Sequence, residues 1–366
     1  MEIPVFNTFI HPLASQLVNN VLGSTFLSEG KLVKEFETRL SEKFGLPYPV
    51  ALNSGTSALH LALELAGIRE NDEVILPAQT FVATGLTILQ VKAVPVFADV
   101  DYQTGNLSIE SLKSKITSRT KAIMPVHWGG YPCDMDEIIA IAAAHRLIII
   151  EDAAHALGAT YKNRPIGSLS EYTCFSFQAI KHLTTGDGGA ISFKNSQDST
   201  MAMTRRWFGI DRQNAALSIL GERQYDIKQV GFKYHMNDYA AALGIANMEG
   251  FSERLAERRR IAQFYFDNLG NIPGLRLFNY KNDREGSFWL FGLHVEKRED
   301  FIRAMKEKGI ATSVIHQRID RNSVFGGLKD LPEQAKFDET QIHIPIHDAV
   351  DKEKAEYVVN SIKQGW

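Results

Sequence analysis

The sequence predicts an α/β fold, in which a mainly parallel sheet and its covering helices form three layers and a smaller α+β domain follows. Short β-branched runs without polar alternation lie between Val50 and Phe193, which is typical of strands covered on both faces. Stretches with helical spacing separate these runs, as in sheets built from strand, helix and strand units. After about Gly250, charged helical segments and strand-like segments replace this pattern.

The expected elements follow one another along the chain. The strand-like runs read EVILP, AVPVFADV, KAIMPVH and RLIIIEDAA, and the helical stretches between Val50 and Phe193 read TSALHLALELAG and CDMDEIIAIAAAH. Beyond residue 250 we expect the charged helix FSERLAERRRIAQFYFDNL, then GSFWLFGLHV, the helix-like REDFIRAMKEKGI and the strand-like ATSVIH. The sequence therefore predicts a large domain over residues 1–250 and a small domain over residues 251–366.

The composition argues against several classes of protein. Forty Lys and Arg residues against 43 Asp and Glu leave a formal charge of -3, so no overall positive field favours nucleic acid or an anionic membrane. Cys133 and Cys174 form no C-x-x-C motif, and no signal peptide or membrane-spanning run is evident, so we expect a cytoplasmic protein. His343 and His347 do not predict a metal site, because Pro345 interrupts the helix that would align their rings.

A candidate phosphate site lies in NSGTSAL, which places Asn53, Ser54, Gly55, Thr56 and Ser57 directly before a predicted helix. Free backbone N–H groups and the positive end of the helix dipole favour a phosphate at such a position. The alternative is an ordinary helix cap formed by Ser or Thr.

A second candidate is the end of the apolar run in IIIEDAAHALGA, where Glu151, Asp152 and His155 follow one another. A carboxylate buried at that depth requires a cationic partner, because an unpaired buried charge is costly. The alternatives are that Asp152 only caps a helix and that His155 is a structural histidine.

The third candidate is Lys181, which lies in FSFQAIKHLTTGDGGAISF between two strand-like runs and before a Gly-rich turn. The alternative is an exposed surface lysine. An amine in an apolar setting has a lowered pKa and can form a Schiff base. A phosphate site, an acidic partner for a ring nitrogen and a lysine for an aldehyde together predict pyridoxal 5′-phosphate as the cofactor.

With these motifs the chain resembles the DegT/DnrJ/EryC1/StrS family of sugar aminotransferases over most of residues 20–250. The shared motifs are SGTSALHLAL, DEVILPAQTFVAT, VPVFADVD, IMPVHWGG, IIEDAAHALGA, IGS, FSFQAIKHLTTGDGG, WFGIDR and MNDYAAALG. The resemblance implies the three-layer fold type I of pyridoxal-phosphate-dependent transferases.

The resemblance also implies roles for single residues. Lys181 would form the Schiff base with the cofactor, and Asp152 would pair with the ring nitrogen. His155 stands where the family has Gln or His near the phenolic oxygen, and Phe81 where an aromatic residue stacks on the ring. The remaining residues match phosphate-binding positions: Gly55, Thr56, Ser57 and Ser176 of the same chain, and Asn237, which would reach the phosphate of a neighbouring subunit. A homodimer with shared active sites is therefore implied.

The implied reaction moves an amino group from an amino acid, by resemblance L-glutamate, to a nucleotide-linked keto-sugar, a 4-keto-6-deoxyhexose. The product would enter a surface polysaccharide, a lipopolysaccharide or a glycosylated metabolite. Two alternatives stay open: a sugar dehydratase on the same scaffold, against which Lys181 argues although His182 is adjacent, and a non-catalytic regulator that binds the cofactor. Sugar selectivity is expected to reside partly in residues 309–327. Bidentate contacts from Arg205, Arg206 and Arg212 to an anionic substrate group are one alternative, but salt bridges within the protein are the expected role of at least two of these arginines.

Overall fold

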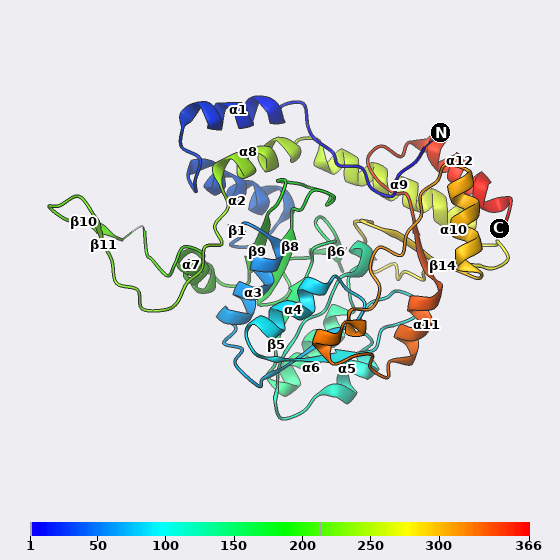
Figure 1. Cartoon of the computed structure of the whole chain (residues 1–366), viewed down its shortest axis with the longest axis horizontal. Helices are drawn as coiled ribbons and strands as arrows, with labels where there is room; N and C mark the ends of the chain where they lie inside the picture. The colour runs from blue at the N-terminus through cyan, green and yellow to red at the C-terminus, as the bar shows by residue number, and fades with distance from the viewer. Residues whose placement is uncertain (1, 213) are drawn as a thin grey trace.

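A computed structural model describes residues 2–212 and 214–366 of the chain. Its centre is a seven-stranded sheet with the strand order β1-β9-β8-β5-β4-β2-β3 (Figure 1). The strands are β1 (Val50–Leu52), β2 (Glu73–Pro77), β3 (Val94–Ala98), β4 (Thr120–Ile123), β5 (Ile148–Asp152), β8 (Tyr172–Ser176) and β9 (Gly189–Phe193). Only β9 runs antiparallel to its neighbours, so the prediction of a mainly parallel sheet is confirmed.

Neighbouring residues on one strand enter cores on opposite faces of the sheet. In β2, Ile75 faces one core, whereas Val74 and Leu76 face the other. The first core is covered by α2 (Lys31–Phe44), α5 (Ile109–Lys115), α6 (Met135–His145) and α8 (Asp238–Asn247). The second is covered by α3 (Gly55–Leu65), α4 (Val82–Gln90) and α7 (Ser196–Arg205). The double burial explains why these strands are apolar without alternation.

A smaller antiparallel sheet lies beside the large one, in the order β12-β14-β15. Its strands are β12 (Leu275–Leu277), β14 (Phe291–Val295) and β15 (Gln341–Ile344), and its helices are α9 (Phe251–Leu269), α10 (Arg298–Glu307) and α12 (Lys352–Lys363). These elements share a third core, which Ile3 near the N-terminus also enters. The long helix α9 runs from the large sheet toward this unit (Figure 1).

The other regular elements are short or peripheral. They are α1 (Ala14–Ser24), α11 (Pro332–Thr340), the 3-10 turns Trp128–Gly130, Ile319–Arg321 and Ser323–Phe325, and the small sheet formed by β13 (Arg284–Glu285), β6 (Thr160–Tyr161) and β7 (Arg164–Pro165).

The strand predicted for ATSVIH is wrong. Residues 311–316 contain one isolated bridge, from Ser313 to His343, and no strand. Ile315 adopts a φ of 62°, which is a left-handed conformation that ends an extended segment. The β-branched residues suggested a strand, but the chain bends here instead and brings His316 inward.

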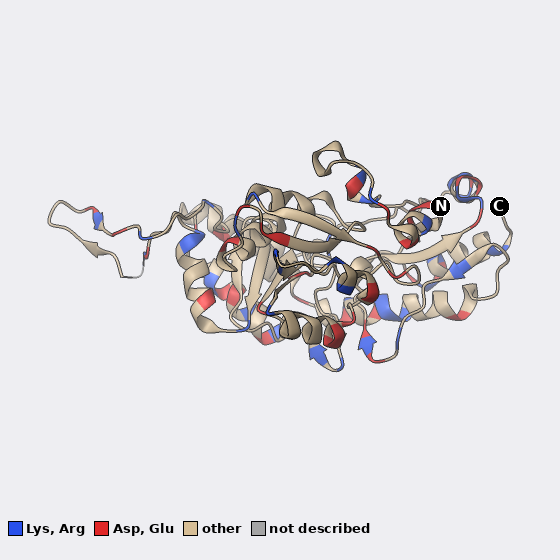
Figure 2. Cartoon of the chain, turned by 90° about the horizontal axis from the view of Figure 1, so that it is seen from below, with Lys and Arg blue, Asp and Glu red and all other residues tan. Residues whose placement is uncertain are grey.

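An arm projects from the body between α7 and α8 and carries the two-residue strands β10 (Ala216–Leu217) and β11 (Arg223–Gln224) (Figures 1 and 2). Its apolar side chains are largely exposed: Leu217 by 69%, Ile219 by 102%, Leu220 by 85% and Val230 by 75%. An exposed apolar patch of this kind indicates a contact with another molecule.

Acidic and basic residues are interspersed along the rest of the chain (Figure 2), in agreement with its small net charge. No helix in the described part of the chain is long and apolar enough to cross a membrane. Within residues 2–212 and 214–366, no three His, Cys, Asp or Glu side chains are grouped so that they could hold a metal ion.

Gly189 of β9 lies so close to the backbone before α3 that this position has no room for a side chain. A Cβ atom at Gly189 would lie 2.4 Å from the backbone C and O of Ser54, so Gly189→Ala should lower the free energy of unfolding by about 1–3 kcal/mol. Gly23→Ala is the control, because no heavy atom lies within 4 Å of its added Cβ. Urea denaturation of both variants measures the difference, and equal stability of Gly189→Ala and wild type would contradict the prediction.

Candidate active site

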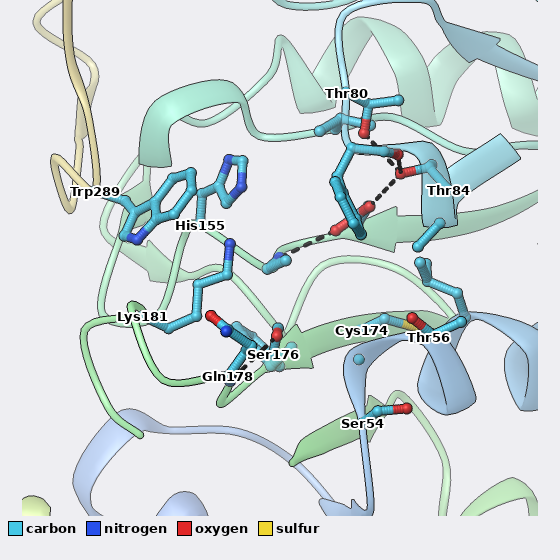
Figure 3. A pocket seen from close by; sticks show the side chains of 18 of the residues that line it. Ser54, Thr56, Thr80, Thr84, His155, Cys174, Ser176, Gln178, Lys181 and Trp289 are labelled. Carbon is cyan, nitrogen blue, oxygen red and sulfur yellow. Dashed lines mark hydrogen bonds between the residues drawn. The ribbon is translucent and has the colours of Figure 1, made fainter. Parts of the chain in front are cut away.

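A cavity of about 390 Å³ lies where β5 and β8 end and α3 begins (Figure 3). Ligands bind at this edge in parallel α/β sheets, because loops and helix N-termini converge there. The polar side chains that line it are Ser54, Thr56, Thr80, Thr84, Asp152, His155, Ser176, Gln178, Lys181, Asp187 and His316. Three separately predicted motifs therefore meet in one cavity.

Lys181 projects into this cavity beside Trp289 and His155 (Figure 3). Its Nζ lies 3.6 Å from the centroid of the Trp289 ring, over the ring face. Burial lowers the pKa of Lys181 to about 7, and the nearby Asp152 opposes part of that shift. Near neutral pH, Lys181 is therefore a neutral amine in a large fraction of the molecules, and the neutral amine is the form that attacks an aldehyde.

Asp152 is the last residue of β5 and lies almost fully buried in the same cavity. Thr84 donates a hydrogen bond of 2.7 Å to one carboxylate oxygen, and the backbone N–H of Ala154 donates one of 3.1 Å to the other. Burial raises the pKa of Asp152, and these two hydrogen bonds oppose the rise. The β5 strand is followed by turns, so the alternative that Asp152 caps a helix is wrong.

The Asp152 carboxylate has no ion-pair partner among the residues that the structure describes. In the described part of the chain, no cationic side chain lies within 4.0 Å of its oxygens. A carboxylate in this setting is stabilised by a cationic ligand atom that enters the cavity. The protonated ring nitrogen of pyridoxal phosphate is such an atom, so Asp152 fits the predicted cofactor.

A buried network directly behind Asp152 holds the end of β5 in place. Glu151, whose side chain faces away from the cavity, accepts hydrogen bonds from Thr173 Oγ1 at 3.0 Å and from His127 Nε2 at 2.7 Å. His127 Nδ1 accepts the backbone N–H of Cys133 at 3.0 Å, which fixes Nε2 as the donating nitrogen. All polar groups of Glu151 are thus satisfied, although neither its side chain nor that of His127 reaches solvent.

His155 stacks on Trp289, with ring centroids 3.8 Å apart and an interplanar angle of 20°. Its Nδ1 is buried and has no hydrogen-bond partner among the described residues. Burial and the nearby Lys181 hold the pKa of His155 well below its usual value, so the ring is neutral. An unpartnered nitrogen at a cavity wall fits a polar atom of a ligand, which supports the predicted position near the cofactor.

The opposite end of the cavity offers donors for a phosphate. Ser54 caps α3 by accepting the N–H of Ser57 at 3.0 Å, whereas Gly55 and Thr56 supply N–H groups of the first helical turn, which have no acceptor within the helix. A Cβ at Gly55 would lie 2.9 Å from the Ser176 side chain, so glycine permits the close approach of β8 to α3. Both the helix cap and the donors of a phosphate site are therefore present.

Two predicted residues do not enter this cavity. Ser57 Oγ donates to Asn53 at 2.7 Å, and its side chain is turned into the loop rather than toward the cavity. Asn237 directly precedes α8, and its Nδ2 donates a hydrogen bond to the Tyr239 hydroxyl at 3.0 Å. Their predicted contacts with the phosphate stay predictions.

His316 enters the cavity from the bent segment that was predicted to be a strand. Its ring lies 5.1 Å from that of Phe81, which also lines the cavity and is 52% exposed. The carbonyl oxygen of His316 accepts hydrogen bonds from Gln79 at 3.0 Å and from Gln341 at 3.3 Å. Gln334 in turn donates to Gln79 at 2.9 Å, and all three glutamines are fully buried. This glutamine cluster fixes the backbone at His316.

Sequence reasoning missed His316, Trp289, Thr84 and Gln178 as cavity residues. Thr84 belongs to the motif TFVAT, which gave only Phe81 as a candidate, and Gln178 lies between Ser176 and Lys181. Trp289 lies in a run that carries the pattern of a strand, and nothing in that pattern connects it with Lys181. Its contact arises only when the small sheet packs beside the large one.

Comparison with known proteins now decides the family. A model of the DegT/DnrJ/EryC1/StrS aminotransferase family matches residues 10–363. The chain belongs to this family. Its members use pyridoxal 5′-phosphate, so the cofactor predicted from the three motifs is confirmed, as is the fold.

Three relatives illustrate the similarity. The sugar aminotransferase CalS13 from Micromonospora echinospora has a crystal structure with 35% identity, a TM-score of 0.95 and full coverage of both chains. The spore coat polysaccharide biosynthesis protein SpsC of Bacillus subtilis is 35% identical over 95% of this chain and 93% of its own length. The GDP-perosamine synthase of Escherichia coli O157:H7 is 30% identical over 99% of this chain and 98% of its own length.

The arginines considered for anion binding have partners within the protein. Arg205 pairs with Glu64 at 2.6 Å, and Arg206 pairs with Glu29 at 2.7 Å. Arg212 lies 3.8 Å from Glu29. These contacts agree with the structural role that was expected for at least two of the three.

The lowered pKa of Lys181 predicts how the cofactor-free protein reacts with added pyridoxal phosphate. Because the neutral amine reacts, the rate should rise with pH and reach half of its maximum near pH 7, rather than near the ordinary lysine value of 10.5. Asp152→Asn should move this midpoint to lower pH, since the Asp152 charge is what raises the pKa of Lys181. Absorbance changes measured against pH give the midpoint, with Lys181→Ala as the unreactive control. A midpoint near pH 10 would refute the assignment.

Proposed function

We propose that this enzyme transfers the amino group of L-glutamate to a nucleotide-linked 4-keto-6-deoxyhexose. The product would enter the synthesis of a surface polysaccharide or lipopolysaccharide. The observation that carries this proposal is the convergence of Lys181, Asp152 and the first turn of α3 on one cavity. The relatives support a sugar as acceptor, since one is a sugar aminotransferase and another a GDP-perosamine synthase.

Each cavity residue has a distinct task in this proposal. Bound pyridoxal phosphate supplies an aldehyde that carries the amino group and a ring that delocalises negative charge. Asp152 stabilises the positive ring nitrogen, while the N–H groups of Gly55 and Thr56 and the hydroxyl of Ser176 hold the phosphate. Lys181, as a neutral amine, would take up at Nζ the proton of the carbon that bears the amino group and would then release it toward the cofactor.

Trp289 and His155 keep that amine in place. The face of the Trp289 ring lies against Lys181 Nζ, and the His155 ring stacks on Trp289. Little water therefore surrounds the amine. Exclusion of water keeps the pKa of Lys181 low and preserves its ability to act as a base near neutral pH.

The dehydratase alternative receives no support from the cavity. His182, the residue considered for it, does not line the cavity, and its Nε2 donates to the carbonyl of Ser287 at 2.8 Å. Lys181 occupies the position that faces Asp152 and the phosphate donors. The presence of Lys181, Asp152 and the phosphate donors of α3 in one cavity also argues against a regulator without catalytic activity.

The proposal includes a cytoplasmic location. Cys133 and Cys174 are both buried free thiols, which suits a reducing compartment.

The experiment that tests the proposed function is amination of a panel of nucleotide keto-sugars with glutamate as donor, followed by mass spectrometry of the products. Wild type should aminate at least one 4-keto-6-deoxyhexose. Lys181→Ala should lose turnover entirely, together with the covalent link that borohydride fixes between protein and cofactor, because Lys181 is the one lysine among the described residues that line the cavity. Fixation of the cofactor on another lysine, or no amination of any keto-sugar, would overturn the proposal.

We also propose that the enzyme works as a homodimer with shared active sites. The exposed apolar arm between α7 and α8 supports a second copy as its partner, since its side chains pack against little of their own chain. Asn237 follows this arm and lies outside its own cavity, as expected of a residue that serves the neighbouring site.

Shared sites predict complementation between two inactive variants. Mixed dimers of Lys181→Ala and Asn237→Ala contain one site with both lesions and one site with none, so random exchange should restore about a quarter of wild-type activity. The test requires limiting cofactor, because one neutral hydrogen bond to a phosphate contributes only about 1–3 kcal/mol. Native mass spectrometry verifies that subunits exchange. No recovery despite exchange would place Asn237 in the site of its own chain.

A further inference from the structure

A second hollow of about 480 Å³ adjoins the active-site cavity and is open to solvent. We call it the loop groove, since residues 313–319, Arg321 and Asn322 form one wall and Thr80, Phe81 and Val82 the other. Thr80, Phe81 and His316 line both the cavity and the loop groove. A ligand can therefore extend from the cavity past Phe81 and His316 into the groove.

The charges around the loop groove favour an anion. No acidic side chain is among the described residues that line it, whereas Arg318 and Arg321 are. Arg318 is buried and neutralised by a bidentate pair with Asp320, at 2.7 and 2.6 Å. Arg321 is exposed, and within residues 2–212 and 214–366 no carboxylate lies within 4.0 Å of it. Arg321 therefore leaves one uncompensated positive charge at the groove.

The backbone that carries Arg321 is braced on two sides. The guanidinium of Arg318 also donates to the carbonyl of Lys329 at 2.9 Å, and the N–H of Lys329 donates to Asp320 at 2.9 Å, which closes the loop upon itself. On the other side, the glutamine cluster of Gln79, Gln334 and Gln341 holds the carbonyl of His316. Buried hydrogen bonds of this kind fix the backbone from which Arg321 projects, which lowers the entropy lost when a ligand binds.

The size of the cavity requires a second binding region. Its 390 Å³ lies near the lower end of the range of about 300–1,000 Å³ for pockets that take one small ligand. A volume at this end of the range suits the cofactor and a sugar ring, which leaves the nucleotide part of the substrate outside the cavity. The alternative anion sites at Arg205 and Arg206 are occupied by ion pairs with Glu64 and Glu29.

On these grounds we infer that the loop groove binds the diphosphate of the nucleotide sugar and that Arg321 is the residue that contacts it. This inference rests on the proposed function, because it assigns a part of the proposed substrate to a place in the structure. Arg321 offers two N–H groups in the planar arrangement that matches phosphate oxygens.

Arg321→Ala tests the inference, because the reaction has two halves that can be measured separately. In the first half glutamate gives its amino group to the cofactor, and in the second half the nucleotide sugar receives it. The diphosphate belongs only to the sugar, so the KM for the nucleotide sugar should rise about 10- to 100-fold, while conversion of the cofactor by glutamate alone changes by less than about twofold. Arg321→Lys should recover part of the loss. Arg276→Ala is the matched control, since Arg276 is exposed, lies on β12 and lines neither the cavity nor the groove.

Binding of nucleoside diphosphates adds a measurement that does not depend on turnover. GDP, UDP and thymidine diphosphate, titrated into the holoenzyme by calorimetry, identify the base that wild type prefers, and the corresponding nucleoside serves as the probe without charge. Arg321→Ala should raise the dissociation constant of the preferred diphosphate about 10- to 100-fold and leave the dissociation constant of the nucleoside unchanged.

The possible outcomes separate the two proposals. Equal affinity of wild type and Arg321→Ala for the diphosphate, with unchanged KM, overturns the inference but leaves the proposed function intact. Equal losses in both half-reactions show that Arg321 only supports the fold, which also overturns the inference. No binding of any diphosphate and no amination by wild type would instead reject the proposed function.

Discussion

The buried carboxylate of Asp152 is the constraint on which the rest of the site depends. Burial disfavours its charge, and two hydrogen bonds, from Thr84 and Ala154, offset only part of that cost. Since no cationic side chain pairs with it in the described part of the chain, the carboxylate is fully stabilised only by a cationic ligand. The protein thereby favours a cofactor whose ring nitrogen is protonated, which is the form that the chemistry requires.

The alternation of side chains along β5 makes this arrangement possible. Glu151 and Asp152 are adjacent acidic residues, and because successive side chains point to opposite faces, Asp152 reaches the cavity while Glu151 meets His127 and Thr173 on the other side. The parallel register sets Thr173 opposite Glu151 and Cys174 opposite Asp152. A shift of one residue would exchange the two carboxylates and remove the site.

Much of this site could be predicted from the sequence, since its motifs are local. Lys181, Asp152 and the segment before α3 each follow a strand or precede a helix, and parallel strands bring such positions to one edge. Trp289 and His316 could not be found in this way, because they reach the cavity through the packing of distant segments. The segment ATSVIH has the residue types of a strand, but the chain bends at Ile315 instead. Tertiary contacts often override local strand preference in this way.

The residues that sequence reasoning missed change the chemistry of those that it found. The Trp289 ring lies against Lys181 Nζ, and burial lowers the pKa of that lysine to about 7, while the charge of Asp152 limits the fall. Greater burial would leave the amine a poorer base, whereas full hydration would keep it protonated and unreactive. Since Trp289 and His316 come from C-terminal segments, the packing of those segments against the large sheet sets the proton affinity of the reactive lysine. A substitution that loosens this packing therefore alters the reactivity of Lys181 without any contact to the cofactor.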